Sequence, residues 1–112
     1  MTEEKICSFM GLAVKAGQAV SGSFMSDKAI KTGKALLVLV ARDASANTRK
    51  GFMDAGKFYE ATVKEIGTKE LLGKFSGKKE RTAVAITNEN FAKRLLSMID
   101  ELNQNHGGAG IE

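Results

Sequence analysis

Side chains able to carry out catalysis are few in this sequence, and their spacing does not bring them together. Its single cysteine, Cys7, leaves no partner for an internal disulfide or a cysteine-based metal cluster. Its single histidine, His106, lies in a Gly-rich stretch near the C-terminal end. Asp27 and Asp43 fall near the ends of predicted strands, but neither has the cysteine or histidine neighbour that nucleophilic or acid–base catalysis needs. We therefore expect no enzyme, no catalytic residue, no cofactor and no metal site.

The glycines also lack the spacing of a nucleotide-binding loop. The sequence contains neither G-x-G-x-x-G nor G-x-x-x-x-G-K-[ST], and Gly11 and Gly17 fall within or at the end of a predicted helix. A nucleophile elbow is missing as well. An enzyme acting on a nucleotide is therefore the least favoured of the functions considered.

The basic residues are concentrated in the middle of the chain. The net charge is +4, and residues 28–81 hold 13 Lys and Arg against 6 Asp and Glu, whereas the remaining residues hold 4 against 7. A basic middle between acidic ends favours a polyanionic partner. The alternative is that these side chains are solvated surface charges without a partner.

Three predicted features could contact a polyanion together. The first is Gly22-Ser23 at the start of a helix, where free backbone N–H groups and the helix dipole favour a phosphate. The second is Lys28 in the same helix, with Lys31 further along it. The third feature is the loop 77–81, which presents Lys78, Lys79 and Arg81. Taken one at a time, each of the three features is better explained as a simple turn or a solvated surface.

A run of apolar residues at 35–41, ALLVLVA, organises the rest of the chain. It is far too short to cross a membrane, and its Val and Leu content predicts a strand buried on both faces. Helix patterns flank this run, and short apolar strands alternate with helices along the whole chain. The expected helices are 3–16, 24–32, 45–58, 69–75 and one that follows Asn88, and the expected strands are 18–22, 35–41, 62–66 and 82–87.

This alternation predicts an α/β fold, a three-layer α/β/α sandwich around a central mixed sheet of about four short strands. Residues 1–103 are expected to form a single domain, followed by a disordered tail at 104–112. Phe52, Ala55 and Tyr59 form the expected buried side of the third helix. The aromatic content, 6%, is too low and too scattered for a single-strand stacking surface of the usual kind.

The first residues of the chain do not have the residue pattern of a targeting signal. Residues 2–5 are polar and charged, and Lys15 interrupts the apolar stretch that follows. We therefore expect a cytoplasmic protein. Cys7 lies beside the apolar stripe of the first helix, where a small, partly buried core residue is expected.

Four segments carry a pattern that covers nearly the whole chain. They are 21–30 (SGSFMSDKAI), 33–45 (GKALLVLVARDAS), 72–74 (LGK) followed by Gly77, and 84–86 (VAI). Together they resemble the L7Ae/L30e family of ribosomal and kink-turn RNA-binding proteins, over residues 5–102 and with the elements in the same order. The opening stretch 9–17 is similar in particular to the bacterial YlxQ-type branch of that family.

The resemblance implies a three-layer sandwich that binds RNA through one edge. Contacts are implied from the start of the second helix, from the loop after the central strand and from the loop before the last strand. Lys28 matches a family lysine in the second helix, and Lys34 matches a basic position before the central strand. The RNA-binding residues so implied are Gly22, Ser23, Phe24, Met25, Lys28, Lys31, Lys34, Arg42, Asp43, Lys78, Lys79 and Arg81.

Two places depart from the family pattern. Members that read the sheared G·A pairs of a kink-turn carry Asn-Glu after the Gly-Thr/Ser pair, where this chain has Phe24 and Met25. Phe and Met side chains cannot hydrogen-bond a base edge, so phosphate binding is retained while kink-turn base readout is in question. The loop 77–81 is also charged where the tightest binders have a more apolar loop.

These features lead to one expected function and one alternative. We expect a non-enzymatic RNA-binding protein, ribosomal or ribosome-associated, that binds structured, kink-turn-like RNA through one basic edge. Its expected partners are structured RNA, foremost ribosomal RNA, and ribosomal proteins, with no membrane contact and a monomeric state. The alternative is a protein-interaction module of the same fold, because Phe24 and Met25 would form an exposed apolar patch.

Overall fold

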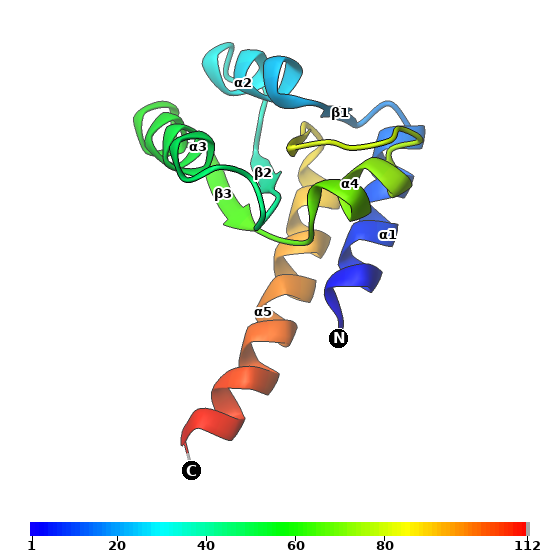
Figure 1. The fold of residues 1–112 in the computed structure, drawn as a ribbon, viewed down its shortest axis with the longest axis vertical. Coiled ribbons are helices and arrows are strands. Elements are labelled where there is room, and N and C mark those ends of the chain that lie inside the picture. The colour runs from blue at the N-terminus through cyan, green and yellow to red at the C-terminus, as the bar shows by residue number, and fades with distance from the viewer. Residues whose placement is uncertain (112) are drawn as a thin grey trace.

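The middle layer of the fold is a mixed four-stranded sheet (Figure 1). The structure is a computed structural model that describes the backbone of residues 1–111 and the side chains of residues 1–104. The strand order is β1 (Ala19–Ser21), β4 (Ala83–Ile86), β2 (Leu37–Val40) and β3 (Thr62–Glu65). Strands β2 and β3 are parallel, whereas β4 runs antiparallel to both of its neighbours.

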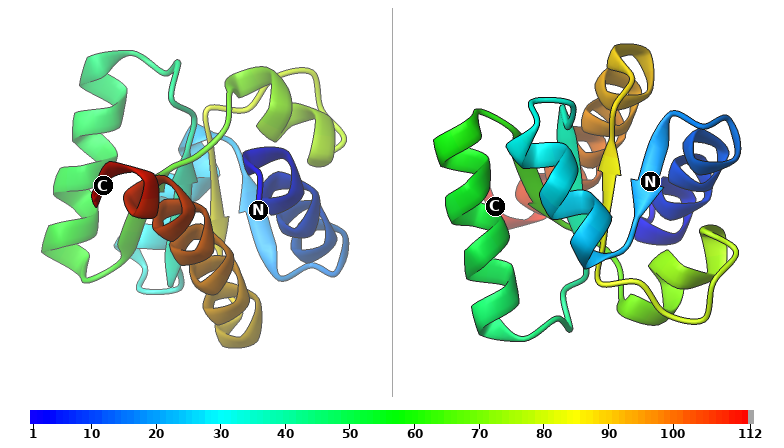
Figure 2. Two further views of the ribbon diagram at one scale, coloured as in Figure 1. Left: turned by 90° about the horizontal axis from the view of Figure 1, so that it is seen from below. Right: turned by 90° about the horizontal axis from the view of Figure 1, so that it is seen from above.

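Helices cover both faces of this sheet. One face carries α1 (Glu3–Lys15), α4 (Lys69–Phe75) and α5 (Glu89–Ile111), and the other carries α2 (Ser23–Lys31) and α3 (Ala46–Tyr59) (Figures 1 and 2). The predicted α/β class, three layers and mixed sheet are confirmed. Within the described part of the chain, every helix is too short or too polar to cross a membrane.

Capping interactions explain where the helices begin. Thr2, Ser45 and Thr68 each accept a hydrogen bond from the backbone N–H three residues further on. The side chain of Asn88 does the same at 3.0 Å at the start of α5. Gly22 precedes α2 with φ of 104°, a conformation that side chains other than glycine's rarely allow. The helix starts predicted at Gly22-Ser23, near Ser45 and after Asn88 are confirmed.

The central strands form the core, as their composition predicts. All residues of β2 and β4 are fully buried between the two helix layers. The observed β2 is nevertheless shorter than the predicted strand 35–41, and Leu36 is 41% exposed. Its backbone N–H bonds to Ile86 at the end of the sheet, so its side chain lies at the rim.

The end of α3 corrects one prediction. Phe52 is buried and Ala55 half-buried, but Tyr59 is 40% exposed rather than buried. The chain leaves the helix after Tyr59 through Glu60, which has φ of 61°, and turns there into β3. Tyr59 therefore lies at the rim of the fold, while Gly56 forms the close contact with the sheet.

Helix α5 is longer than the predicted domain. Its buried, apolar side is formed by Leu95, Met98, Ile99 and Leu102. Its backbone continues as helix to Ile111. The side chains of residues 105–111, including His106, and all of residue 112 lie outside the described residues. The domain boundary at 103 and the tail at 104–112 therefore remain predictions.

Candidate nucleic-acid interface

One end of the sheet brings together loops that are far apart in the sequence. Strands β1 and β2 end there, and β4 begins there. Backbone hydrogen bonds of 2.8 Å join Gly22 N to Ala83 O and Ala41 N to Thr82 O. We call the resulting rim the basic edge; its residues are Gly22, Ser23, Arg42, Asp43, Lys69 and 78–82.

A chain of hydrogen bonds ties these loops to one another. The Asp43 carboxylate accepts a bond from the backbone N–H of Lys69 at 2.9 Å, and the carbonyl of Lys69 accepts one from the N–H of Arg81 at 3.0 Å. The Arg81 side chain in turn donates to Ser21 Oγ at 3.3 Å. A Cβ added to Gly22 would lie 3.7 Å from Arg81 Cδ, so the guanidinium stem packs against the start of α2.

Three helices start at the basic edge. Figure 2 shows the first turns of α2, α3 and α4 and the loop before β4 along one side of the molecule in its right-hand view. The first turns of α2 and α3 contain no acidic residue. Because Gly22 has no side chain to cap α2, backbone N–H groups of that first turn can bind an anion.

The loop before β4 adds exposed positive charge to these helix starts. Lys78 and Lys79 are exposed, and Lys79, Glu80 and Arg81 line an open hollow of about 460 Å³. Among the described residues, no carboxylate forms an ion pair with Lys78, Lys79 or Arg81. Their charge is therefore available to a phosphate.

Arg42 also reaches the basic edge, but its charge is partly neutralised. Its guanidinium forms a two-pronged contact with the Glu3 carboxylate at 2.9 Å, and this hydrogen bond raises the pKa of Arg42. Glu3 also accepts a bond from the backbone N–H of Gly67. Arg42 thus joins the start of α1 to the loop before α4 and offers less free charge than Arg81.

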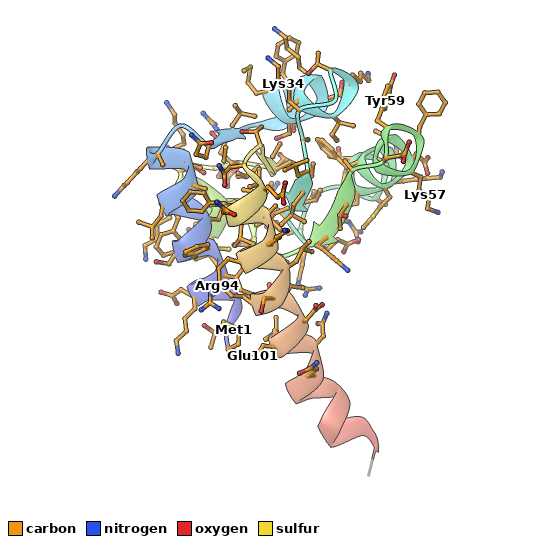
Figure 3. All side chains as sticks on the ribbon, turned by 180° about the vertical axis from the view of Figure 1, so that it is seen from behind. Met1, Lys34, Lys57, Tyr59, Arg94 and Glu101 are labelled. Atoms are coloured by element: carbon orange, nitrogen blue, oxygen red, sulfur yellow. The ribbon has the colours of Figure 1, made fainter. Side chains whose placement is uncertain are left out.

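Two of the predicted lysines lie elsewhere. Lys34 precedes β2 whereas Arg42 follows it, so the two lie at opposite ends of that strand. Lys28 is in the last turn of α2 and lines a hollow of about 180 Å³ with Lys34, Thr32 and Thr87. We call this hollow the distal end; Figure 3 shows Lys34 beside the end of α2. The predicted residues are thus not all gathered at one end of the sheet.

Phe24 and Met25 are exposed at the start of α2, by 77% and 43% respectively. Phe24 lies over a groove of about 470 Å³ between α2 and α3. Lys31 lines the same groove and pairs with Asp27 at 2.9 Å, and that hydrogen bond raises the pKa of Lys31. We call this the α2–α3 groove; its lining residues are Ser23, Phe24, Asp27, Lys31, Thr48, Gly51, Phe52 and Ala55.

The residues considered for catalysis have structural roles. Burial, with smaller effects from Glu3 and Glu4, raises the pKa of the Cys7 thiol to about 12, and the side chain is fully buried. Asp27 is paired with a lysine, and Asp43 is bonded to a helix start. In the part of the chain that is described, no cluster of His, Cys, Asp and Glu could hold a metal ion.

Sequence reasoning missed two basic residues of this region. Lys69 opens α4 and links Asp43 to Arg81 through its backbone. Arg49, in the first turn of α3, donates to the Ala44 carbonyl at 3.0 Å and pairs with Glu65 at 3.4 Å. The capping pattern of Thr68 predicted the start of α4, but no local signal in the sequence predicts that this start lies beside Arg81.

Comparisons with known proteins agree with this fold. The Ribosomal protein L7Ae/L30e/S12e/Gadd45 family matches residues 4–96. The RNA-binding protein YlxQ of Bacillus subtilis (strain 168) is 38% identical over 91 residues, which are 81% of this chain and 91% of that protein. The protein of the same name from Enterococcus faecium is 32% identical over 97 residues, 87% of this chain and 93% of that one.

Solved structures agree as well. A protein of unknown function from Bacillus halodurans C superposes with a TM-score of 0.80 and 33% identity, over 86% of this chain and 97% of that one. The Giardia lamblia 15.5kD RNA binding protein shares the fold, with a TM-score of 0.72 and 17% identity over 90% of this chain and 86% of that one. The family expected from the sequence pattern is therefore confirmed, and this chain belongs to the Ribosomal protein L7Ae/L30e/S12e/Gadd45 family.

Proposed function

We propose that this chain is a non-enzymatic RNA-binding protein that holds structured RNA by its basic edge. The observation that carries the proposal is the convergence of three helix starts with Arg81, Lys78 and Lys79 on one rim. The relatives named YlxQ are described as RNA-binding proteins, which supports RNA as the polyanion. The partner we infer is ribosomal RNA, bound by a monomer in the cytoplasm.

Phosphates account for most of the binding energy in this proposal. One phosphate accepts hydrogen bonds from backbone N–H groups of the first turn of α2, which starts at Ser23 without a side-chain cap and where the helix dipole is favourable. Arg81 packs against Gly22, so its guanidinium group can donate hydrogen bonds to the same phosphate. Lys78 and Lys79 add flexible cations on the neighbouring loop. The bonds of Asp43 and Lys69 hold these groups in a constant arrangement before RNA arrives.

Base recognition is weaker than in a kink-turn reader. Phe24 and Met25 stand where such proteins carry hydrogen-bonding side chains, and both are exposed. We infer that the protein recognises the shape and backbone of its RNA more than its base edges. Kink-turn-like geometry then selects the RNA only by how it presents phosphates to the basic edge.

A salt titration with paired variants tests the proposal. Each phosphate contact contributes about 0.7 to 0.9 to the slope of log K against log salt. We expect Lys78→Ala/Lys79→Ala to weaken binding of a labelled ribosomal RNA fragment and to reduce the slope by about 1.5. The matched control is Lys15→Ala/Lys93→Ala, which removes the same charge from α1 and α5. Equal slopes for both variants would refute binding through the basic edge.

The exposure of Phe24 over the α2–α3 groove favours a second candidate, a protein-interaction module. The same titration separates the two functions. A folded protein that binds no structured RNA at any salt concentration would support the module and exclude the first candidate.

A further inference from the structure

The exposed aromatic side chains are all on one face of the molecule. The sequence holds six Phe and one Tyr. Three of these are exposed, Phe24 by 77%, Phe58 by 78% and Tyr59 by 40%, and all three belong to α2 and α3. The other aromatic residues are buried or half-buried. Residues that are scattered in the sequence are thus gathered on the two helices that flank the α2–α3 groove.

The α2–α3 groove runs from the basic edge toward Tyr59. Ser23 and Phe24 form its end at the basic edge, and Phe52 and Ala55 form its apolar floor. Tyr59 follows Ala55 by one helical turn, at the far end of α3, as Figure 3 shows. The rise in the pKa of Lys31 is caused mainly by the hydrogen bond that Lys31 donates to Asp27, and the charge of Tyr59 adds slightly to it.

Only part of the positive charge on these helices is free on this face. Residues 27–34 and 49–60 carry six Lys and Arg against three Asp and Glu, but Lys31, Arg49 and Lys50 form ion pairs. Lys28 and Lys34 line the distal end instead. Lys31 borders the groove, and Lys57 is exposed on α3 beside Phe58. Because Ser23 belongs to both the basic edge and the groove, a strand that leaves an RNA bound at the basic edge would enter the groove. There Phe24, Phe58 and Tyr59 offer rings on which its bases can stack, and Lys57 offers a charge for a phosphate.

We propose that the α2–α3 groove is a second RNA site, which takes the single strand that leaves the structured element at the basic edge. This inference rests on the proposed function. Bases stack on Phe24 at the near end and on Tyr59 and Phe58 at the far end, while phosphates lie near Lys31 and Lys57. The distance along α3 from Thr48 to Tyr59 is roughly 17 Å, which matches about five stacked nucleotides.

Tyr59 offers a direct test, because it is the only tyrosine and the sequence has no tryptophan. We would compare one structured RNA with blunt ends against the same RNA with a single-stranded tail of about six nucleotides, placed at either end. The tailed RNA is expected to quench Tyr59 fluorescence and to bind at least about five-fold more tightly, the usual effect of one stacked base. The blunt RNA should bind without quenching Tyr59.

Variants at Phe58 separate stacking from general apolar contact. Phe58→Ala and Phe58→Leu should both lose most of the tail's gain, and Phe58→Tyr should keep it, while binding of the blunt RNA is unchanged in all three. Leu12→Ala is the matched control, since Leu12 is 54% exposed on α1, across the sheet. It should keep the tail's full gain.

The outcomes distinguish the two proposals. Binding of the blunt RNA with no gain from either tail would overturn the second site alone, and would be the result if the groove serves a protein partner. A Phe58→Leu variant that keeps the full gain would also overturn stacking. Failure of both RNAs to bind would overturn the proposed function and the second site with it.

Discussion

The basic edge and the distal end both carry exposed lysines without a carboxylate partner among the described residues, yet their backbones differ in polarity. At the basic edge α2, α3 and α4 begin, so the positive ends of their dipoles lie there, and α2 starts without a side-chain cap for its N–H groups. At the distal end α2 finishes. There the chain presents carbonyl groups of the last turn of α2, which contains Lys28, and the Lys28 carbonyl already accepts a bond from the Thr32 hydroxyl at 2.8 Å.

This difference teaches that the number of cations alone does not define an anion site. Lys28 and Lys34 count as much in the sequence charge as Lys78 and Lys79. The helix dipole adds to the lysine charge at one end of the sheet and opposes it at the other. Hydrogen bonds between loops also hold the basic edge together, from Asp43 through Lys69 to Arg81. We therefore expect the two ends to respond differently to matched changes.

The largest effect is expected from a glycine beneath the basic edge. A Cβ at Gly73 would lie 2.6 Å from Glu80 Cα and 2.7 Å from Lys79 O, so Gly73→Ala must displace the loop that carries Arg81. We expect a loss of about 1 to 3 kcal/mol in the free energy of unfolding and at least about ten-fold weaker RNA binding. Chemical denaturation and RNA titration measure the two.

The control for this change lies at the distal end. Gly33 has φ of 76° and open space around it, so Gly33→Ala costs backbone strain of about 1 to 2 kcal/mol without moving the basic edge. If it weakened RNA binding as much as Gly73→Ala, the loss would reflect stability and the comparison would fail.

The two ends can next be compared by salt dependence. Lys28→Ala/Lys34→Ala removes the same charge as Lys78→Ala/Lys79→Ala, from the distal end instead of the basic edge. We expect the distal pair to change the slope of log K against log salt by less than about 0.5, against about 1.5 for the basic-edge pair. A distal effect of the same size would restore Lys28 and Lys34 to the RNA site.

Polar side chains at the start of α2, next to the basic edge, should improve base readout. Phe24 lines the α2–α3 groove and Met25 lines the distal end. Phe24→Asn/Met25→Glu replaces both exposed apolar side chains by groups that can hydrogen-bond guanine. Selectivity for a kink-turn over a plain duplex should rise about five-fold or more. Competition binding with the two RNAs measures it, and circular dichroism checks the fold. An unchanged ratio in a folded variant would remove these positions from base readout.

The smallest effect concerns Cys7, which packs below Gly67 beside the basic edge. Its pKa is raised to about 12, mainly by burial, from an ordinary value near 9. The folded state therefore favours the neutral thiol, and its contribution to stability is complete below pH 9 and lost as pH rises toward 12. At about pH 9.5 we expect a loss of about 1 kcal/mol in the free energy of unfolding.

Cys7→Ala provides the comparison for that measurement. Between pH 8 and 9.5 the denaturation midpoint of this variant should fall less than that of the native protein, because the variant has no thiol to ionise. The native protein should also resist alkylation near pH 8, where a buried thiol is neutral. Rapid alkylation without unfolding would mean that the underside of the basic edge opens easily.

Local sequence patterns predicted the elements well. The alternation of apolar runs and amphipathic helices predicted every strand and helix in order, with α4 matched at both ends. Gly22, Ser45 and Asn88 signalled helix starts because caps depend on residues within one turn. The prediction that Tyr59 is buried was wrong. Tyr59 fits the apolar stripe of the helix, but it lies where the chain turns away from the sheet and is exposed.

The sequence by itself determined the elements, the core strands and the basic residues available for binding, because these depend on neighbours within a few positions. Only the tertiary structure decided which basic residues act together. Strand order placed Gly22, Arg42 and Arg81 at one end of the sheet and Lys34 at the other. It also gathered Phe24, Phe58 and Tyr59 on one face, because two helices far apart in sequence pack side by side there.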